Sequence, residues 1–224
     1  MSVFAGRDLR CRRGEREVFA GLGFTVARGD ALLLRGPNGS GKSSLLRCMA
    51  GLLRPVAGVI VWDDREIAED LDAHRRRLHF LGHQDAVKPV LSLEENLAFW
   101  ADLRCADAAS RRAATQRRTE ALAHFAIDHL ATLPARLLSA GQRRRLALAR
   151  LIASPGPLWL LDEPTAALDE ASVARFETAV AAHRAQGGSV VLAIHGSIDL
   201  PGARTLALAD FAPPASFERD EAAS

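Results

Sequence analysis

GPNGSGKS, residues 36–43, is the stretch that decides the fold. It fits the pattern GxxxxGKS and stands between an apolar run at 30–35 (DALLLR) and helix-forming residues at 43–53. A glycine-rich turn between a strand and a helix turns its backbone N–H groups inward, where they bind the phosphates of a nucleotide. We therefore expect ATP to contact this loop, through residues Gly36, Pro37, Asn38, Gly39, Ser40, Gly41, Lys42, Ser43 and Ser44.

Four side chains are expected to act on the triphosphate. Lys42 places a positive charge beside the β- and γ-phosphates, and the Ser43 hydroxyl is a ligand for Mg²⁺. Asp162 and Glu163 follow the apolar run LWLL at 158–161, at a strand end of the kind where open parallel sheets bind ligands. We expect Asp162 to hold Mg²⁺ and its waters, and Glu163 to accept a proton from the attacking water.

Composition excludes several classes of protein. The 29 basic and 27 acidic side chains leave a formal charge of +2 over 224 residues, which names neither nucleic acid nor an anionic membrane as a partner. Arginine groups at 75–77, 111–112 and 117–118 are interpreted as solvated faces. The three cysteines, Cys11, Cys48 and Cys105, have neither zinc-site spacing nor the density of a disulfide scaffold, which favours a reducing cytosol.

The pattern of apolar segments predicts an α/β domain over 1–211. Short alternating pieces in the first thirty residues predict a small antiparallel sheet, and residues 92–153 predict a helical subdomain. Apolar strands that alternate with amphipathic helices indicate a mostly parallel core sheet covered on both faces. Further strands are expected at 57–63, 78–82 and 189–194. A helix is expected between the apolar runs at 158–161 and 189–194, and a flexible tail from about 212 to 224. No run approaches the roughly 20 apolar residues that span a bilayer.

At LSAGQ, residues 138–142, the sequence resembles the ABC ATPase family, whose motifs occur here in the family's order from about residue 18 to 209. The resemblance implies a P-loop NTPase fold of the ABC type, with an antiparallel β subdomain and an inserted helical subdomain. It also implies that Ser139, Gly141 and Gln142 face the γ-phosphate held by a second copy of the chain. Ala140 stands where the family has glycine, a small replacement that a backbone with negative φ tolerates.

Three single residues take roles from the same resemblance. Gln84 resembles the glutamine that reaches Mg²⁺ and the attacking water. His195 resembles the histidine that contacts the γ-phosphate and couples to the catalytic glutamate, and Asp169 resembles the loop acid that signals across the dimer.

The base of the nucleotide lacks its usual partner. The chain has no tyrosine, and the place where the family puts an aromatic ring against adenine is near Arg13, with Phe19 and Phe4 the nearest rings. A guanidinium can stack on a base instead, so Arg13 is the candidate and the adenine contact stays open.

Within the family, the chain is similar to ATP-binding subunits of the cytochrome c maturation (haem export) system, on FLGHQ at 80–84, Lys88, LSLEENL at 91–97 and LSAGQRRRLALARL at 138–151. This resemblance implies integral membrane partners, a peripheral place on the cytoplasmic face of the bacterial inner membrane, and no direct haem contact by His83. Another cargo, such as a lipid or drug, stays open. A DNA-repair or chromosome ATPase is disfavoured, because no long coiled coil separates the motifs.

Overall fold

A five-stranded sheet forms the centre of the molecule in the computed structural model, which describes residues 3–104, 107–196 and 198–213. Its pairings are all parallel, in the order β6-β7-β8-β3-β9. The strands are β3 (Ala31–Arg35), β6 (Leu78–Leu81), β7 (Leu158–Asp162), β8 (Ser189–Ala193) and β9 (Arg204–Ala207). Because β7 and β8 are central and short apolar runs, their backbone and side chains are fully buried.

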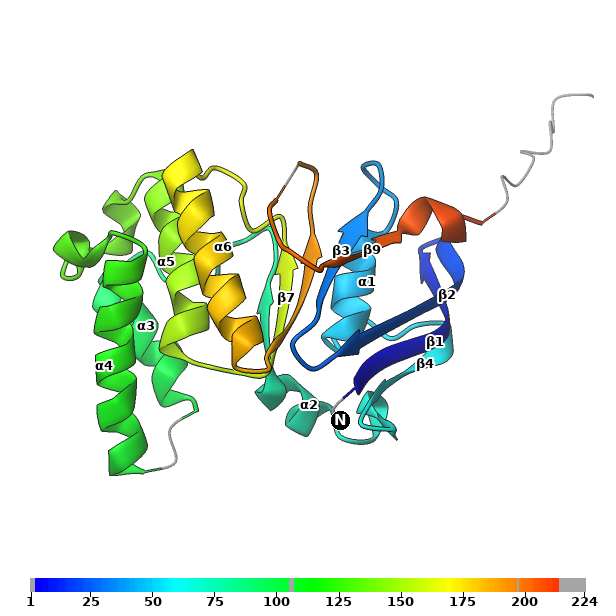
Figure 1. Ribbon diagram of the computed structural model, residues 1–224, viewed down its shortest axis with the longest axis horizontal. Coiled ribbons are helices and arrows are strands. Elements are labelled where there is room, and N and C mark those ends of the chain that lie inside the picture. Colours follow the sequence, from blue (N-terminus) through cyan, green and yellow to red (C-terminus); the bar gives the residue numbers. More distant parts are fainter. Residues whose placement is uncertain (1–2, 105–106, 197, 214–224) are drawn as a thin grey trace, which may run out of the picture.

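A second, antiparallel sheet lies beside the first, on the right in Figure 1. Its order is β2-β1-β4-β5, from β1 (Val3–Arg13), β2 (Arg16–Ala27), β4 (Ala57–Trp62) and β5 (Arg65–Glu66). Asp63 and Asp64 form the turn between β4 and β5 with φ of 51° and 62°, a left-handed conformation that aspartate tolerates better than most residues.

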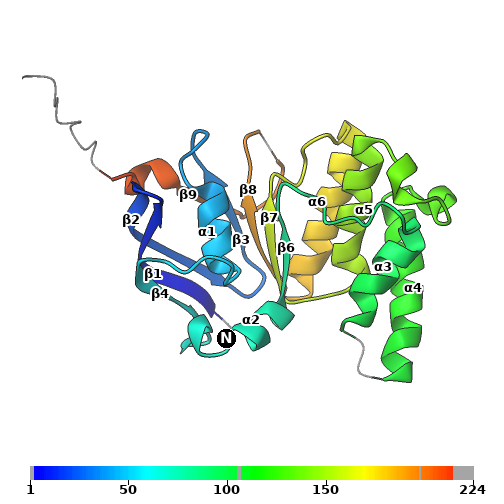
Figure 2. The same cartoon turned by 180° about the vertical axis from the view of Figure 1, so that it is seen from behind.

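The helices cover both faces of the parallel sheet. They are α1 (Lys42–Met49), α2 (Leu71–Arg77), α3 (Leu93–Asp102), α4 (Ala108–His124), α5 (Ala140–Ala153) and α6 (Glu170–Ala185). Short 3₁₀ turns span Ile67–Glu69, Asp128–Leu130, Ala135–Leu137 and Leu208–Phe211. Figures 1 and 2 show α1 enclosed between the two sheets, with α5 and α6 on the other side of the parallel sheet and α3 and α4 beyond them.

The strand pleat divides the interior into two cores. Along β7, Leu158 and Leu160 point to the core shared with α1 and the antiparallel sheet. Trp159 and Leu161 point to the core shared with the helices α3 to α6. Since successive side chains of a strand point to opposite faces, one apolar run supplies both cores. The parallel sheet is therefore the shared wall that fixes α1 relative to α5.

Most elements expected from the sequence are confirmed. The antiparallel sheet, the parallel sheet with both faces covered, and the helical region after residue 92 all occur. Three elements were not predicted: α2, β9 and the two-residue strand β5. The helix α2 is short and ends in three arginines, and β9 is an edge strand with an incomplete apolar alternation, so neither has a clear periodic signal. Cys105 and the expected tail beyond residue 213 lie outside the described residues.

No helix in the described ranges has the length and apolar character needed to cross a bilayer.

A buried histidine makes the fold sensitive to acid. His79 on β6 is 4% exposed, and its Nε2 contacts the carbonyl of Ser154. Burial, together with the charges of Arg104 and Arg150, lowers the pKa of His79 to about 3. The folded protein therefore holds this ring neutral, whereas the unfolded chain protonates it below its ordinary pKa near 6.5.

We predict that this difference lowers the free energy of unfolding as pH falls below 6.5. At pH 5 the loss from His79 alone is about 2 kcal/mol. His79→Gln keeps an N–H donor for the Ser154 carbonyl but does not titrate, so urea unfolding at pH 7 and pH 5 should differ less in this variant than in the wild type. The exposed His129→Gln variant is the control. An unchanged pH dependence in His79→Gln would contradict the prediction.

Candidate active site

The phosphate loop joins β3 to α1 at the carboxyl end of the parallel sheet. Gly39 and Gly41 have φ of 79° and 101°, which glycine adopts without strain. At Gly41 a Cβ atom would also lie 2.5 Å from Cγ1 of Val18, so a larger residue fits neither the conformation nor the space. Gly41 makes no side-chain cap for α1, and the first N–H groups of that helix stay available for an anion.

Lys42 closes the loop from within. Its side chain is 6% exposed, and Nζ donates hydrogen bonds to the carbonyls of Gly36 at 2.7 Å and Pro37 at 3.0 Å. Burial lowers the pKa of Lys42, while the carboxylates of Glu163 and Asp162 oppose that shift. The loop is thus already folded around a buried cationic centre that lies close to both acids.

Asp162 is suited to hold a divalent cation. It ends β7, is 2% exposed, and its Oδ1 is buried without a hydrogen-bond partner among the described residues. A buried carboxylate oxygen without a donor is costly unless a ligand satisfies it, and Mg²⁺ prefers oxygen ligands. No three His, Cys, Asp or Glu side chains converge in the described chain, so the protein supplies only part of an octahedral shell. The residues therefore fit Mg²⁺ held by Asp162 and Ser43, with phosphate oxygens and water completing the shell.

His83, rather than Gln84, is the residue that contacts these two groups. His83 Nε2 lies 3.2 Å from Ser43 Oγ and 3.2 Å from Asp162 Oδ2. The neighbouring Gln84 is exposed, and no hydrogen bond joins its side chain to another described residue. From the sequence, His83 was expected to make no direct haem contact, and no other role was predicted for it; its position beside Gln84 after β6 was the one signal for this contact.

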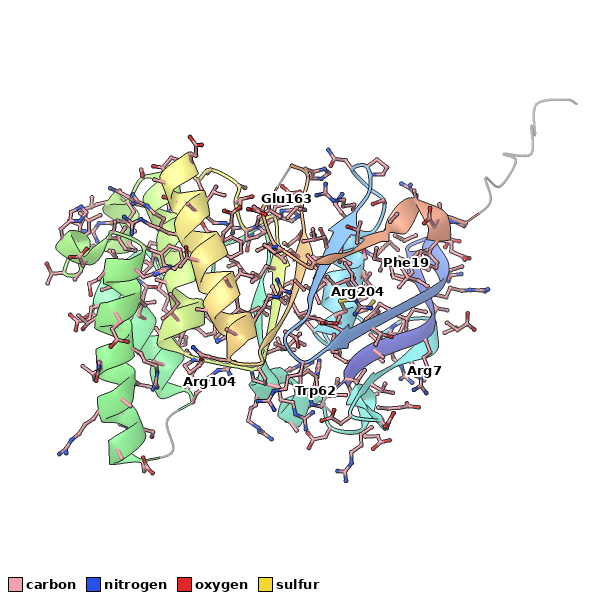
Figure 3. All side chains as sticks on the ribbon, in the orientation of Figure 1. Arg7, Phe19, Trp62, Arg104, Glu163 and Arg204 are labelled. Atoms are coloured by element: carbon pink, nitrogen blue, oxygen red, sulfur yellow. The ribbon has the colours of Figure 1, made fainter. Side chains whose placement is uncertain are left out.

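Glu163 and His195 form a pair at the ends of two neighbouring strands. His195 Nε2 lies 3.3 Å from Glu163 Oε1, and both side chains are partly exposed, 43% and 33%. Glu163 has φ of 50°, an uncommon conformation for this residue type, and its N–H donates to the Ala193 carbonyl at 2.8 Å. Figure 3 shows Glu163 at the upper edge of the parallel sheet, where β7 ends. The acid is directed toward open space beside the phosphate loop.

One hollow of about 390 Å³ brings the phosphate loop and this pair together. Its walls include Lys42, Ser43, Glu163, His195 and His83. This volume lies within the range of about 300–1,000 Å³ typical of small-molecule sites. The geometry supports a bound triphosphate with a basic loop on one side and a carboxylate on the other.

The LSAGQ residues lie elsewhere. Ser139 caps α5 by accepting a hydrogen bond from the Gln142 N–H at 3.2 Å, and Gln142 Oε1 accepts from the Ser139 N–H at 2.9 Å. Gly141 packs closely, because a Cβ there would lie 3.0 Å from the Ala167 carbonyl. None of these three residues lines the hollow around the phosphate loop. Within one chain, the helix start at Ser139 has no phosphate loop opposite it.

Asp169 also acts as a helix cap. Its Oδ1 accepts a hydrogen bond from the Ser172 N–H at 2.8 Å at the start of α6. Hydrogen bonds from Ser172 lower the pKa of Asp169, so this exposed acid is held in its ionised form.

Comparisons with known proteins agree with this geometry. Residues 19–166 match the family model described as ABC transporter. The chain belongs to the ABC transporter family. Two relatives, each called cytochrome c biogenesis ATP-binding export protein CcmA, come from Rhodospirillum rubrum and Paramagnetospirillum magneticum. The first is 58% identical over 96% of this chain and 89% of its own length. The second is 56% identical over 94% and 96%.

Solved structures show the same ABC fold. An ABC transporter ATP-binding protein from Pyrococcus furiosus aligns with a TM-score of 0.80 at 22% identity, covering 94% of this chain and all of that one. A dimeric ATP-binding cassette, MJ0796, bound to ADP and Pi aligns with a TM-score of 0.73 at 24% identity, covering 86% of this chain and 88% of that one. These likenesses confirm the expected fold class.

Arg144 contacts the end of β7, a position that the sequence did not predict. It lies on α5, two residues after Gln142, and is 5% exposed. Its guanidinium donates to the carbonyls of Pro164 at 3.0 Å, Asp162 at 3.0 Å and Glu163 at 2.5 Å. It also forms an ion pair with Asp85 at 2.7 Å. One side chain therefore joins α5, the end of β7 and the segment after β6.

We predict that Arg144→Lys slows hydrolysis more than it weakens ATP binding. A lysine keeps the charge but has one nitrogen in place of the three separated guanidinium nitrogens that make these contacts, so the turn that holds Glu163 loses its support. We expect kcat to fall at least about 10-fold, ATP affinity to stay within about 2-fold, and the free energy of unfolding to fall by about 2 kcal/mol.

Arg143→Lys is the matched control, because among the described residues Arg143 donates a single hydrogen bond, to the Leu138 carbonyl at 3.2 Å. Turnover assays, ATP titration and urea unfolding of both variants make the comparison. Wild-type turnover in Arg144→Lys would show that the turn holds Glu163 without this guanidinium.

Proposed function

We propose that this chain hydrolyses ATP to drive an ABC export system of cytochrome c maturation, with haem as the exported group. One observation supports it most: the Glu163–His195 pair faces the Lys42 loop across a single hollow, in a chain 58% identical to a cytochrome c biogenesis ATP-binding export protein. A lipid or drug exporter would use the same site, so the proposed cargo rests on the names of the relatives rather than on the site residues.

The loop and the carboxylates divide the chemistry between them. Lys42 and the N–H groups at the start of α1 bind the β- and γ-phosphates and offset their charge. Ser43 and Asp162 would hold Mg²⁺, which would supply further neutralisation of the phosphate oxygens. We expect Gln84, in the segment after β6, to contact that ion. Because His83 lies beside Ser43 and Asp162, its side chain must move away from this position or share it with Gln84.

Glu163 is the proposed general base. Water attacks the γ-phosphorus, the bond to the β–γ bridging oxygen breaks, and Glu163 takes the proton that the water loses, so that ADP and inorganic phosphate form. His195, 3.3 Å from Oε1, keeps the carboxylate aimed at that water and contacts the γ-phosphate. The exposed position of Glu163 requires that a second surface exclude bulk water.

A second copy of the chain is the proposed source of that surface. The start of α5 is formed by Ser139, Gly141 and Gln142, which do not line the hollow around the phosphate loop of the same chain. A helix N-terminus is an anion site, so this one can bind a phosphate held by another chain. When two chains face each other, each chain completes the site of the other, so each ATP is enclosed by the phosphate loop of one chain and the Ser139 helix of the other. Asp169, at the cap of the following helix, is the candidate for contact across this dimer.

Glu163→Gln should bind ATP normally and fail to hydrolyse it. Removing the base should lower kcat by at least about 100-fold, and the uncleaved triphosphate then holds two chains together. Light scattering with ATP should report a dimer of Glu163→Gln. Lys42→Ala should bind ATP at least about 10-fold more weakly and remain a monomer, because the loop loses its cation.

Adding Ser139→Arg to Glu163→Gln separates dimer closure from loop binding. The bulky cation blocks the Ser139 helix start, so this double variant should bind ATP without dimerising. If Glu163→Gln turns over ATP at the wild-type rate, Glu163 is not the base.

The cargo is tested through the membrane partners. The segment from Gln84 to Leu91 is the proposed transmission site, and it would place the chain peripherally on the cytoplasmic face of the membrane. Capture of tagged chain from detergent-solubilised membranes of the source cells should recover integral membrane subunits of cytochrome c maturation. Recovery of a lipid or drug permease in their place would assign another cargo while leaving the ATPase proposal intact.

A further inference from the structure

A second hollow lies at the opposite end of the parallel sheet from the phosphate loop. It has a volume of about 490 Å³ and lies beside the amino ends of β3, β7 and β8. Figure 3 shows Trp62, one of its wall residues, at the lower edge of the molecule, whereas Glu163 lies at the upper edge. None of the described residues lines both this hollow and the proposed nucleotide site.

The apolar walls of this hollow come from parts of the chain that are far apart in the sequence. Phe4 and Trp62 belong to β1 and β4 of the antiparallel sheet, and their ring centroids are 5.8 Å apart. Val26 on β2, and Pro155 and Pro157 before β7, add to the apolar surface. Sites for small organic ligands are mostly apolar hollows of about 300–1,000 Å³, with a few polar groups that orient the ligand. The volume and the apolar walls of this hollow agree with that description.

Two arginines supply the charge of the hollow. Arg28 and Arg77 both line it, whereas no aspartate or glutamate of the described residues does. Within the described part of the chain neither guanidinium has an ion pair, and Cζ of Arg77 lies 5.8 Å from the centroid of the Trp62 ring. The nearby acid Asp30 is instead paired with Arg204 at 2.8 Å. Two cations without a carboxylate partner favour an anionic ligand, because hydrogen bonds between ionised groups are the strong ones.

His183, in the last turn of α6, is the other titratable residue in the walls. Its ring stacks on Trp159 with 3.9 Å between centroids and 8° between the ring planes. Burial lowers the pKa of His183 to about 4, so the ring is neutral at pH 7 and the arginines carry the charge. A Cβ on Gly188 would overlap this ring, and a Cβ on Gly187 would overlap Nε of Arg28. The two glycines therefore let both side chains lie directly against the backbone of the turn after α6.

We propose that this hollow is a second ligand site, which binds a small organic anion with a planar apolar body, such as an aromatic carboxylate, sulfonate or phosphate. Arg28 and Arg77 bind the anionic group, since a guanidinium donates paired hydrogen bonds to two oxygens of one oxyanion. The apolar body packs against Trp62 and the two prolines. An inorganic anion would leave these apolar walls in water and would therefore gain less from the site.

A ligand in this hollow would contact several elements at once. Its walls include Trp62 of the antiparallel sheet, Arg77 at the end of α2 and Gln186 after α6. A ligand that binds the folded chain and not the unfolded one raises the free energy of unfolding. The site therefore joins the two sheets at the end of the molecule that the nucleotide does not reach, and it does not depend on the proposed ATPase.

Three probes on the full-length chain separate charge from apolar contact: naphthalene-1-sulfonate, the neutral naphthalene-1-sulfonamide and inorganic sulfate. Calorimetry measures binding, and the indole N–H signals of Trp62 and Trp100 in NMR spectra report its location, with the Trp62 signal assigned by its loss in Trp62→Phe. We expect naphthalene-1-sulfonate to bind with a Kd of about 1 mM or lower, at least about 10-fold tighter than the other two probes. It should shift the Trp62 signal and leave that of Trp100, which lies on α3, in place.

Equal affinity for the sulfonate and the sulfonamide would show an apolar hollow without anion recognition and would overturn the proposal. Sulfate that binds as tightly as naphthalene-1-sulfonate would overturn it as well, and so would a Trp62 signal that does not move at saturation.

Arg28→Gln and Gln186→Glu identify the contact. The first removes a cation and the second adds a carboxylate of nearly the same shape, and both positions are exposed, so both variants should fold. We expect Arg28→Gln to weaken naphthalene-1-sulfonate binding at least about 5-fold and Gln186→Glu at least about 10-fold. Arg65→Gln is the control, because it removes an exposed cation paired across the strands with Trp62 but outside the hollow, and it should change binding less than about 2-fold. Unchanged binding in the first two variants, or an equal loss in all three, would contradict the assignment.

ATP distinguishes this site from the proposed nucleotide site. Saturating ATP should leave the affinity for naphthalene-1-sulfonate within about 3-fold, because the two hollows have separate walls. Displacement of the probe by ATP would place it at the phosphate loop and overturn the second site. A chain that binds the sulfonate beside Trp62 but does not bind ATP would contradict the ATPase and leave this inference intact.

Discussion

The guanidinium of Arg144 is the constraint on which the arrangement of the site depends. It is buried on α5 and donates to the backbone carbonyls that flank Glu163, while its charge is balanced by Asp85 after β6. Three segments far apart in the sequence are thus tied to one planar group. Because carbonyls at a strand end need donors when buried, the turn and the helix fix each other. This contact fixes the direction of Glu163, the proposed general base.

The two cores carry that constraint across the molecule. The parallel sheet presents alternate side chains to α1 on one face and to α5 and α6 on the other. Arg144 therefore connects the Ser139 helix start to the end of β7, and the sheet connects both to the phosphate loop.

The sequence was sufficient to predict the parts with strong local signals. The loop at 36–43, the acids at 162–163 and the cap at Ser139 each depend on residues close together in the chain, and each element formed where it was expected. His83 and Arg144 were not identified, because their contacts join residues 18 to 79 positions apart. Gln84 keeps its predicted role only as a proposal, since its neighbour occupies the position between Ser43 and Asp162.

The end of β7 places its two neighbouring acids, Asp162 and Glu163, in different surroundings. Asp162 is the last residue of the strand and is directed into the interior, whereas Glu163 begins the turn and emerges toward solvent. A chain with the two letters exchanged would have identical composition and charge, yet the longer acid would crowd the enclosed position and the shorter one would fall short of the open one. Linear order along the backbone is thereby a chemical property of this protein, set by the end of the strand at Asp162 and by the left-handed turn at Glu163.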